Sequence, residues 1–145
     1  MTLVFCIDKF GGLLFNHRRP ARDAKQIENL LKIRGNRRIV AEPYSEDLLG
    51  DAENVIYTDD VFGVLEKDDI FFSESPKINE YFNLFDEIIV YRWNFPYPFD
   101  VTFDVDLPES GYRRFSSVRF KGDFHPKITR DIFRKHEETK DGCQL

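Results

Sequence analysis

The sequence predicts a mixed α/β fold in which a mostly parallel sheet is flanked by helices and followed by a C-terminal antiparallel hairpin. Short apolar runs alternate with segments of helical periodicity as far as Trp93, which is typical of parallel strands joined by helices. The first run, Leu3–Ile7, is continuously apolar, as expected of a strand that is covered on both faces. Residues 113–120 and 127–134 then read as two long strands that follow each other across a turn, without a helix between them.

Length and composition predict one folded domain. The chain has 145 residues, of which 41% are hydrophobic and 15% aromatic. A chain of this length buries roughly 70% of its unfolded surface. No repeat or linker divides it, so we expect a single α/β domain over residues 1–137 and a frayed polar tail over residues 138–145. The formal net charge of −5 argues against tight, sequence-independent binding to nucleic acid, which needs a broad basic surface.

The cysteines and the apolar segments bear on the compartment. Cys6 lies in an apolar run and Cys143 in the polar tail, so no disulfide framework is predicted. The apolar stretch at the start is too short for a signal peptide, and no apolar run has the length of a membrane span. The simplest prediction is a cytoplasmic protein with no membrane partner. The sequence leaves its oligomeric state open.

The helices are predicted from periodicity and punctuation. Four apolar residues recur at helical spacing before Gly35, which is placed to end that helix: Ala24, Ile27, Leu30 and Leu31. Ser45 can cap a short helix, and an aspartate pair precedes another over 61–66. Ser75-Pro76 suits the start of a helix that extends to Phe85. Residues 13–15 are predicted to be a short extended piece or a packed loop, and the remaining strands are predicted over 38–41, 54–58, 70–72 and 88–93.

Neither the histidines nor the later aspartates predict a metal site. The spacing of the three histidines, His17, His125 and His136, matches no metal-binding motif. Three aspartates alternate with apolar residues, which predicts the outer face of a half-buried strand; they are Asp100, Asp104 and Asp106.

The order of segments resembles the dihydrofolate reductase-like superfamily. FCIDKFGGLLFN (Phe5 to Asn16) is similar to that family's first strand and glycine-containing loop, and KINEYFNLFDEIIVYRWN (Lys77 to Asn94) to its later helix, turn and strand. GYRRFSSVRF and KITRDIFRK are similar to its closing hairpin. The resemblance implies that Asp23 is the carboxylate that, in the family's reductases, helps to bind and protonate the pterin. The FNHRR segment is also similar to that of small uncharacterised Firmicutes proteins, some labelled ribonuclease, whose histidine-rich metal motif is absent here.

Two departures from the family pattern concern its nicotinamide cofactor. Glu74-Ser75-Pro76 stands where the family has a glycine pair, which lets a pyrophosphate approach the main chain. Ala41-Glu42-Pro43 stands where the family has a glycine and an arginine that holds a cofactor phosphate. Carboxylates at both places would repel a phosphate, so we expect that NADPH binding is lost and that the protein has no cofactor. A cis Ser75–Pro76 bond could replace the strained peptide of the glycine pair.

The densest polar cluster lies just before the first helix. It combines an amide, a histidine, three arginines and a carboxylate: Asn16, His17, Arg18, Arg19, Arg22 and Asp23. Arginine can hold a carboxylate or phosphate through two hydrogen bonds, and histidine titrates near neutral pH. We therefore predict a site for a small anionic ligand, with Asp23 and His17 as candidate catalytic residues and with Asp23 as either a proton-transfer or an anchoring group. The alternative is a solvated loop in which Arg22 pairs with Asp23.

Two aromatic residues complete the predicted site. Tyr91 and Trp93 alternate with Arg92 near the end of a strand, where rings can stack on a flat ligand. Packing in the core is the alternative, and for such residues the commoner one.

The sequence predicts a binding domain of the reductase-like fold that lacks a working NADPH site and binds a small anion or a partner. Three alternatives remain open. They are a reductase with altered cofactor geometry, an inhibitor-like or immunity-type protein-interaction module with an acidic surface, and a metal-independent ribonuclease that uses His17.

Overall fold

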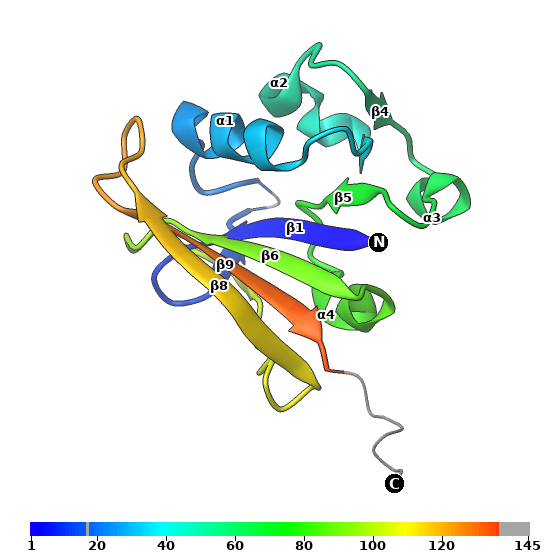
Figure 1. The fold of residues 1–145 in the computed structure, drawn as a ribbon. Helices are drawn as coiled ribbons and strands as arrows, with labels where there is room; N and C mark the ends of the chain where they lie inside the picture. The colour runs from blue at the N-terminus through cyan, green and yellow to red at the C-terminus, as the bar shows by residue number, and fades with distance from the viewer. Residues whose placement is uncertain (17, 137–145) are drawn as a thin grey trace, which may run out of the picture.

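The computed structural model describes residues 1–16 and 18–136, which form a seven-stranded mixed sheet with helices on both faces (Figure 1). The strand order is β4-β3-β5-β1-β6-β9-β8, and β1 is parallel to both β5 and β6. The predicted roles of His17 and of the tail over residues 138–145 lie outside the described residues.

Strands occupy β1 (Thr2–Ile7), β2 (Gly12–Leu14), β3 (Ile39–Ala41), β4 (Val55–Tyr57), β5 (Ile70–Phe72), β6 (Glu87–Arg92), β7 (Val101–Thr102), β8 (Tyr112–Phe120) and β9 (Ile128–Lys135). Helices occupy α1 (Ala24–Ile33), α2 (Glu46–Leu49), α3 (Val61–Val64) and α4 (Ile78–Tyr81), with 3₁₀ turns at η1 (Pro43–Ser45) and η2 (Phe82–Leu84).

The predicted fold class is confirmed: the sheet is mainly parallel, flanked by helices, and carries antiparallel strands at one side. Successive side chains of β1 point to opposite faces, as the period of a strand requires. Leu3 and Phe5 join the apolar cluster that includes Ile78 of α4, whereas Val4 joins the cluster that includes Leu30 of α1. The central strand is therefore covered on both faces, which explains its continuous apolar run.

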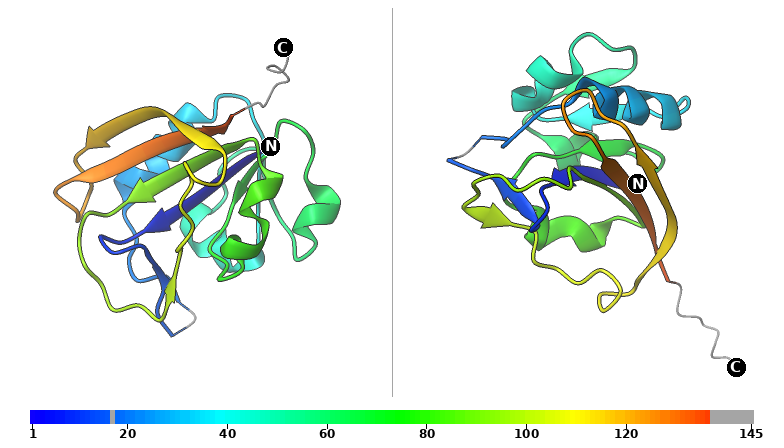
Figure 2. Two further views of the ribbon diagram at one scale, coloured as in Figure 1. Left: turned by 90° about the horizontal axis from the view of Figure 1, so that it is seen from below. Right: turned by 90° about the vertical axis from the view of Figure 1, so that its left-hand side faces the viewer.

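The C-terminal hairpin (β8 and β9, residues 112–135) extends the sheet beyond β6 and curls away from the parallel strands (Figures 1 and 2). β8 is the edge strand, and most of its side chains are exposed. A bulge between Arg114 and Ser116 interrupts its pairing with β9.

The predicted helix from Ser75 to Phe85 is wrong in length, because α4 spans only Ile78–Tyr81 and a 3₁₀ turn follows. The Tyr112 hydroxyl of β8 donates to the carbonyl oxygens of Phe82 and Phe85, at 3.1 and 2.5 Å. A distant side chain thus satisfies carbonyl groups that a longer helix would pair with its own amides.

The strand predicted from the alternating aspartates is also largely wrong. Only β7, Val101–Thr102, is a strand there, and it pairs with β2 in a separate two-stranded sheet. The two-stranded sheet leaves Asp104 and Asp106 in an irregular loop. None of the helices in the described ranges is long and apolar enough to cross a membrane.

Candidate functional site

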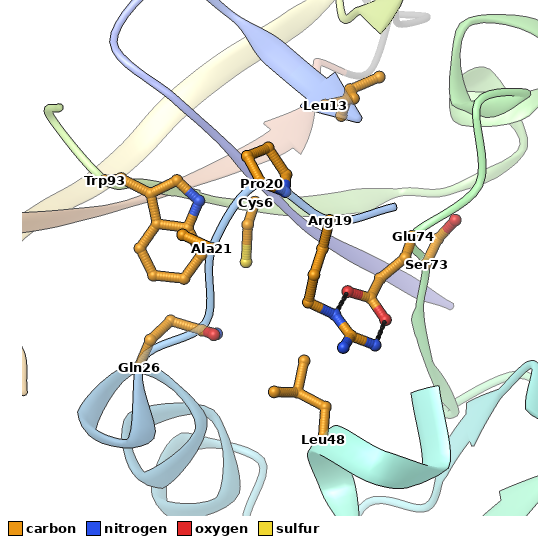
Figure 3. Close-up of a pocket in the computed structure, with 10 residues that line it drawn as sticks. All are labelled: Cys6, Leu13, Arg19, Pro20, Ala21, Gln26, Leu48, Ser73, Glu74 and Trp93. Carbon is orange, nitrogen blue, oxygen red and sulfur yellow. Dashed lines mark hydrogen bonds and ion pairs between the residues drawn. The ribbon is translucent and has the colours of Figure 1, made fainter. Parts of the chain in front are cut away.

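Arg19 and Glu74 form an ion pair at the carboxyl ends of the parallel strands, in the place where the resemblance leads one to expect a nicotinamide cofactor. Arg19 precedes α1 and Glu74 follows β5. Arg19 Nε and one terminal nitrogen donate to the two carboxylate oxygens at 2.5 and 2.8 Å (Figure 3). The side chains are only 13% and 11% exposed. This fork geometry is the strongest that arginine offers to a carboxylate, and we call the pair the latch.

Each half of the latch has a second partner. The Ser45 hydroxyl donates to Glu74 at 2.7 Å. Arg19 donates to the exposed carboxylate of Asp47 at 3.0 Å and lies over the ring of Tyr44 at 4.5 Å. Bonding to Glu74 and Asp47 raises the pKa of Arg19 above its ordinary value, which keeps the guanidinium charged.

Ser45 is the N-cap residue of α2, as predicted from the sequence. Its side chain makes no capping hydrogen bond, because its hydroxyl donates to Glu74 instead. A local capping signal was therefore overridden by a tertiary contact with a residue 29 positions away.

Arg19 and Glu74 also line a small cavity of about 20 Å³, which is the space of roughly one water molecule. We call it the cleft cavity. Its lining comes from β1 and β2, from the ends of β5 and β6, from α2 and from the segment around the start of α1 (Figure 3): Cys6, Leu13, Arg19, Pro20, Ala21, Gln26, Leu48, Ser73, Glu74 and Trp93. Gln26 is 1% exposed, and its Nε2 has no hydrogen-bond partner among the described residues.

Asp23 is buried and its carboxylate is engaged by main-chain amides. It caps α1 by accepting from the Lys25 amide, and it accepts from the amides of Asp123, Phe124 and His125 at 2.7, 3.0 and 3.1 Å. It is 1% exposed. The carboxylate thus anchors the turn of the C-terminal hairpin to the start of α1.

The protonation of Asp23 follows from these bonds. Burial by itself raises its pKa, but the amide bonds and the bond to His125 outweigh burial and lower the pKa to about 2. A group that donates a proton near neutral pH needs the opposite shift. The geometry therefore favours an anchoring role for Asp23 over the predicted proton transfer. The predicted pairing of Asp23 with Arg22 is wrong, because Arg22 donates to the Asp47 carbonyl.

A hydrogen-bonded chain extends from Asp23 through His125 to Tyr97. His125 Nδ1 lies 2.8 Å from the Asp23 carboxylate, and Nε2 lies 2.5 Å from the Tyr97 hydroxyl. Because the ionised carboxylate can only accept, Nδ1 donates to Asp23. The Trp93 indole stacks on the imidazole of His125, with ring centroids 4.6 Å apart. Because Trp93 lines the cleft cavity, these hydrogen-bonded side chains lie beside it.

Glu42 lies where a phosphate-binding cation was expected from the family pattern. Burial and the nearby Asp59 raise its pKa, Lys77 opposes them, and Glu74 adds a further increase. The carboxylates of Asp59 and Glu74 thus oppose the ionisation of Glu42. A phosphate would meet the same repulsion.

The predicted site residues are only partly brought together. Asn16, Arg18 and Arg19 line a shallow hollow of about 460 Å³ together with Phe15, Pro20 and Pro98. The Asp100 carboxylate accepts a hydrogen bond from the main-chain amide of Asn16, which is one of these lining residues. The predicted anion site thus stays a prediction, although Arg19 is already bound to two carboxylates.

Tyr91 and Trp93 have different surroundings, although both belong to the strand end. Tyr91 is completely buried and donates to Asn29 at 2.7 Å. This position offers no ring face to a ligand, so the predicted stacking role of Tyr91 is not available in this conformation. Trp93 is 3% exposed and lines the cleft cavity.

No cis peptide bond occurs among the described residues, so the Ser75–Pro76 bond is trans and the proposed substitute for the glycine pair is wrong. In the same ranges no three metal-ligating side chains lie together. The third histidine, His136, contacts Arg113 at 3.1 Å. This contact lies at the open end of the hairpin, whereas Asp23 binds the turn at its other end.

Comparison with known proteins bears on the fold alone. No protein-family model and no curated protein sequence matches the chain. Among solved structures, it is similar to a dihydrofolate reductase from Enterococcus faecalis complexed with NADP(H) and RAB-propyl, with 12% sequence identity and a TM-score of 0.68. The match covers 94% of this chain and 96% of that one. The chain has the dihydrofolate reductase fold. The fold resemblance inferred from the sequence is thereby confirmed.

Sequence reasoning missed the partners that define the site. Glu74 was recognised only as an obstacle to a phosphate, and no local signal linked it to Arg19, which is 55 residues away. Neither Gln26 nor His125 lies in a recognisable sequence motif, because the residues that contact each of them come from segments that are distant along the chain. The position of Gln26 on the apolar face of α1 was the one available signal.

Proposed function

We propose that the protein is a binding domain of the dihydrofolate reductase fold that does not use NADPH and that takes a small molecule in the cleft cavity. The observation that carries this proposal is the latch. An ion pair with a supporting serine fills the place in which the resembled enzymes need bare backbone, and a phosphate there would have to displace Glu74 from Arg19.

Two further observations support the loss of the nicotinamide site. Glu42 adds a second carboxylate beside Glu74, and the first turn of α2 carries Glu46 and Asp47. Helix N-termini bind phosphates through free amides and a favourable dipole, and acidic side chains at that end compete with an incoming anion. The same charges count against the small anionic ligand predicted from the arginine cluster.

The test is a titration with NADPH, followed by Trp93 fluorescence and by calorimetry. Trp93 is the single tryptophan and it lines the cleft cavity, so its emission reports on this site. We expect no saturable change at millimolar NADPH, with an NADPH-binding dihydrofolate reductase as the positive control. Saturable binding of one NADPH per chain, or oxidation of NADPH in the presence of dihydrofolate, would overturn the proposal.

A second candidate function is a protein-interaction module, and the C-terminal hairpin favours it. Residues 112–136 contain eight lysines and arginines but two aspartates, whereas the whole chain has an excess of acidic residues. The edge strand β8 exposes Phe115 and Val118 among these arginines. A basic edge with unpaired backbone groups suits an acidic partner that adds an extended segment.

Polyglutamate serves as the probe for this second candidate. Binding that is lost in 0.5 M salt and in Arg113→Glu/Arg114→Glu supports it, since exposed charge pairs are screened at about that ionic strength. Equal binding by this double variant would contradict it. Lys25→Glu/Lys32→Glu is the control with an equal charge change, because both lysines are exposed on α1.

A further inference from the structure

The cleft cavity contains one buried donor that is not satisfied by the described residues, and this donor specifies what the cavity can take. Gln26 projects from α1 toward the space between Cys6, Arg19 and Trp93 (Figure 3). Its Nε2 lacks a partner although the side chain is almost completely buried. A buried amide without a partner is costly, so an acceptor atom placed in the cavity would be stabilised.

The charges around the cavity exclude a charged occupant. Arg19 and Glu74 neutralise each other at 2.5 Å, and the Cys6 thiol is kept protonated because burial and Glu74 raise its pKa. A charged ligand in the cleft cavity would have no counter-charge in a desolvated place. Apart from Ser73, whose hydroxyl is hydrogen-bonded to that of Tyr81, the remaining lining is mostly apolar: Leu13, Pro20, Ala21, Leu48 and Trp93.

Arg19 and Glu74 both line the cavity, so their ion pair limits the space that is left for a ligand. With the latch closed the cavity has room for about one water molecule. Opening separates Arg19 from Glu74 but leaves each with a partner, since Asp47 still binds the guanidinium and Ser45 still donates to the carboxylate. A side-chain rearrangement in which both charges stay hydrogen-bonded costs much less than one that leaves a charge bare.

We propose that the Arg19–Glu74 latch borders a binding site for a small, uncharged molecule that has an apolar body and a carbonyl-type oxygen, which accepts from Gln26 Nε2. This inference rests on the proposed function, because it assigns the ligand class of the same cavity. It differs from the proposed function in that NADPH plays no part in its test.

Acetophenone is the probe, because it combines a flat apolar ring with a single carbonyl oxygen. Benzoate and 1-phenylethylamine are matched probes of similar shape with a negative and a positive charge. The readout is the side-chain amide resonance of Gln26 in the nitrogen–proton spectrum of the full chain, assigned by its loss in Gln26→Leu. We expect acetophenone to shift this resonance with saturation and the two charged probes to leave it in place.

The latch makes a second prediction for the same titration. Glu74→Gln keeps the shape of the side chain but weakens the ion pair, so the open form is more populated and acetophenone binds about tenfold more tightly. Ser75→Ala, which leaves the latch intact, binds as the unaltered protein does. No shift of Gln26 at saturating acetophenone, an equal shift with benzoate, or no gain in Glu74→Gln would overturn the inference.

A chemical measurement keeps the inference testable if Gln26→Leu does not fold. In a Cys143→Ser background Cys6 is the one remaining cysteine, and it lines the cavity. With Glu74→Gln added, which weakens the latch and removes the Glu74 charge that raises the pKa of Cys6, acetophenone should slow the modification of Cys6 by N-ethylmaleimide, and benzoate should not. An unchanged rate with acetophenone overturns the ligand class, while the absence of NADPH binding would still support the proposed function.

Discussion

The cleft end of the parallel strands and the C-terminal hairpin use arginine in different ways. In the cleft, Arg19 is mostly buried and is bound by Glu74 and Asp47. On β8, Arg113, Arg114 and Arg119 are exposed at the edge of the sheet. An arginine-rich segment in a sequence therefore does not by itself indicate an available anion site, because the carboxylates that neutralise it can come from anywhere in the chain.

Asp23 joins the two regions, because its carboxylate binds the turn of the hairpin from the start of α1. Removing this carboxylate should therefore have the largest effect on stability. Asp23→Ala leaves the amides of residues 123–125 and the first turn of α1 without their acceptor. We expect a loss of about 4 kcal/mol in the free energy of unfolding, measured by urea titration. Asp47→Ala is the control, since that carboxylate is 59% exposed and its removal should cost about 0.5 kcal/mol. Similar losses in the two variants would contradict the anchoring role of Asp23.

The lowered pKa of Asp23 also predicts how the free energy of unfolding depends on pH. Its pKa is about 2 in the folded protein against an ordinary value of 3.8, so the folded state holds its proton less tightly. The contribution is complete above pH 3.8 and is lost as the pH falls toward 2, which amounts to about 2 kcal/mol. Urea titrations between pH 5 and pH 2 measure it. A decline of the same size in Asp23→Ala would assign the acid sensitivity to other groups.

The latch should contribute less to stability than Asp23, because its two side chains are more exposed than the Asp23 carboxylate. Glu74→Ala leaves Arg19, which is 13% exposed, with the exposed Asp47 as its remaining carboxylate partner. We expect a loss of about 1.5 kcal/mol in the free energy of unfolding. Ser75→Ala at the neighbouring position is the control and should change stability little. A neutral effect of Glu74→Ala would mean that the ion pair only balances its own desolvation.

Charge changes on the hairpin should have the smallest effect on stability. In Arg113→Glu/Arg114→Glu both altered side chains lie on the exposed edge strand. We expect the free energy of unfolding, measured by thermal denaturation, to change by no more than about 0.5 kcal/mol, as is usual for surface substitutions. A larger loss would show that β8 depends on its arginines for its own pairing, and the contrast between the two regions would then weaken.

The sequence predicted the sheet and most element positions because these depend on local periodicity. The runs at Leu3–Ile7 and Ile70–Phe72 and the apolar face of α1 signalled buried elements without reference to the rest of the chain. The prediction of α4 failed in its second half, where Tyr112 binds the carbonyl groups of Phe82 and Phe85. Such a contact joins residues about 30 positions apart and has no local signature.

The sequence by itself determined the α/β class, the order of its elements and the absence of a glycine pair at residues 74–76. Only the tertiary structure decided which polar groups are available. It directs Ser45 and Arg19 to Glu74, directs Asp23 to the hairpin turn, and leaves Gln26 facing a cavity. The physical reason is that a hydrogen bond or an ion pair depends on distance in space. The pattern of apolar residues sets the fold, and the fold then selects the partners.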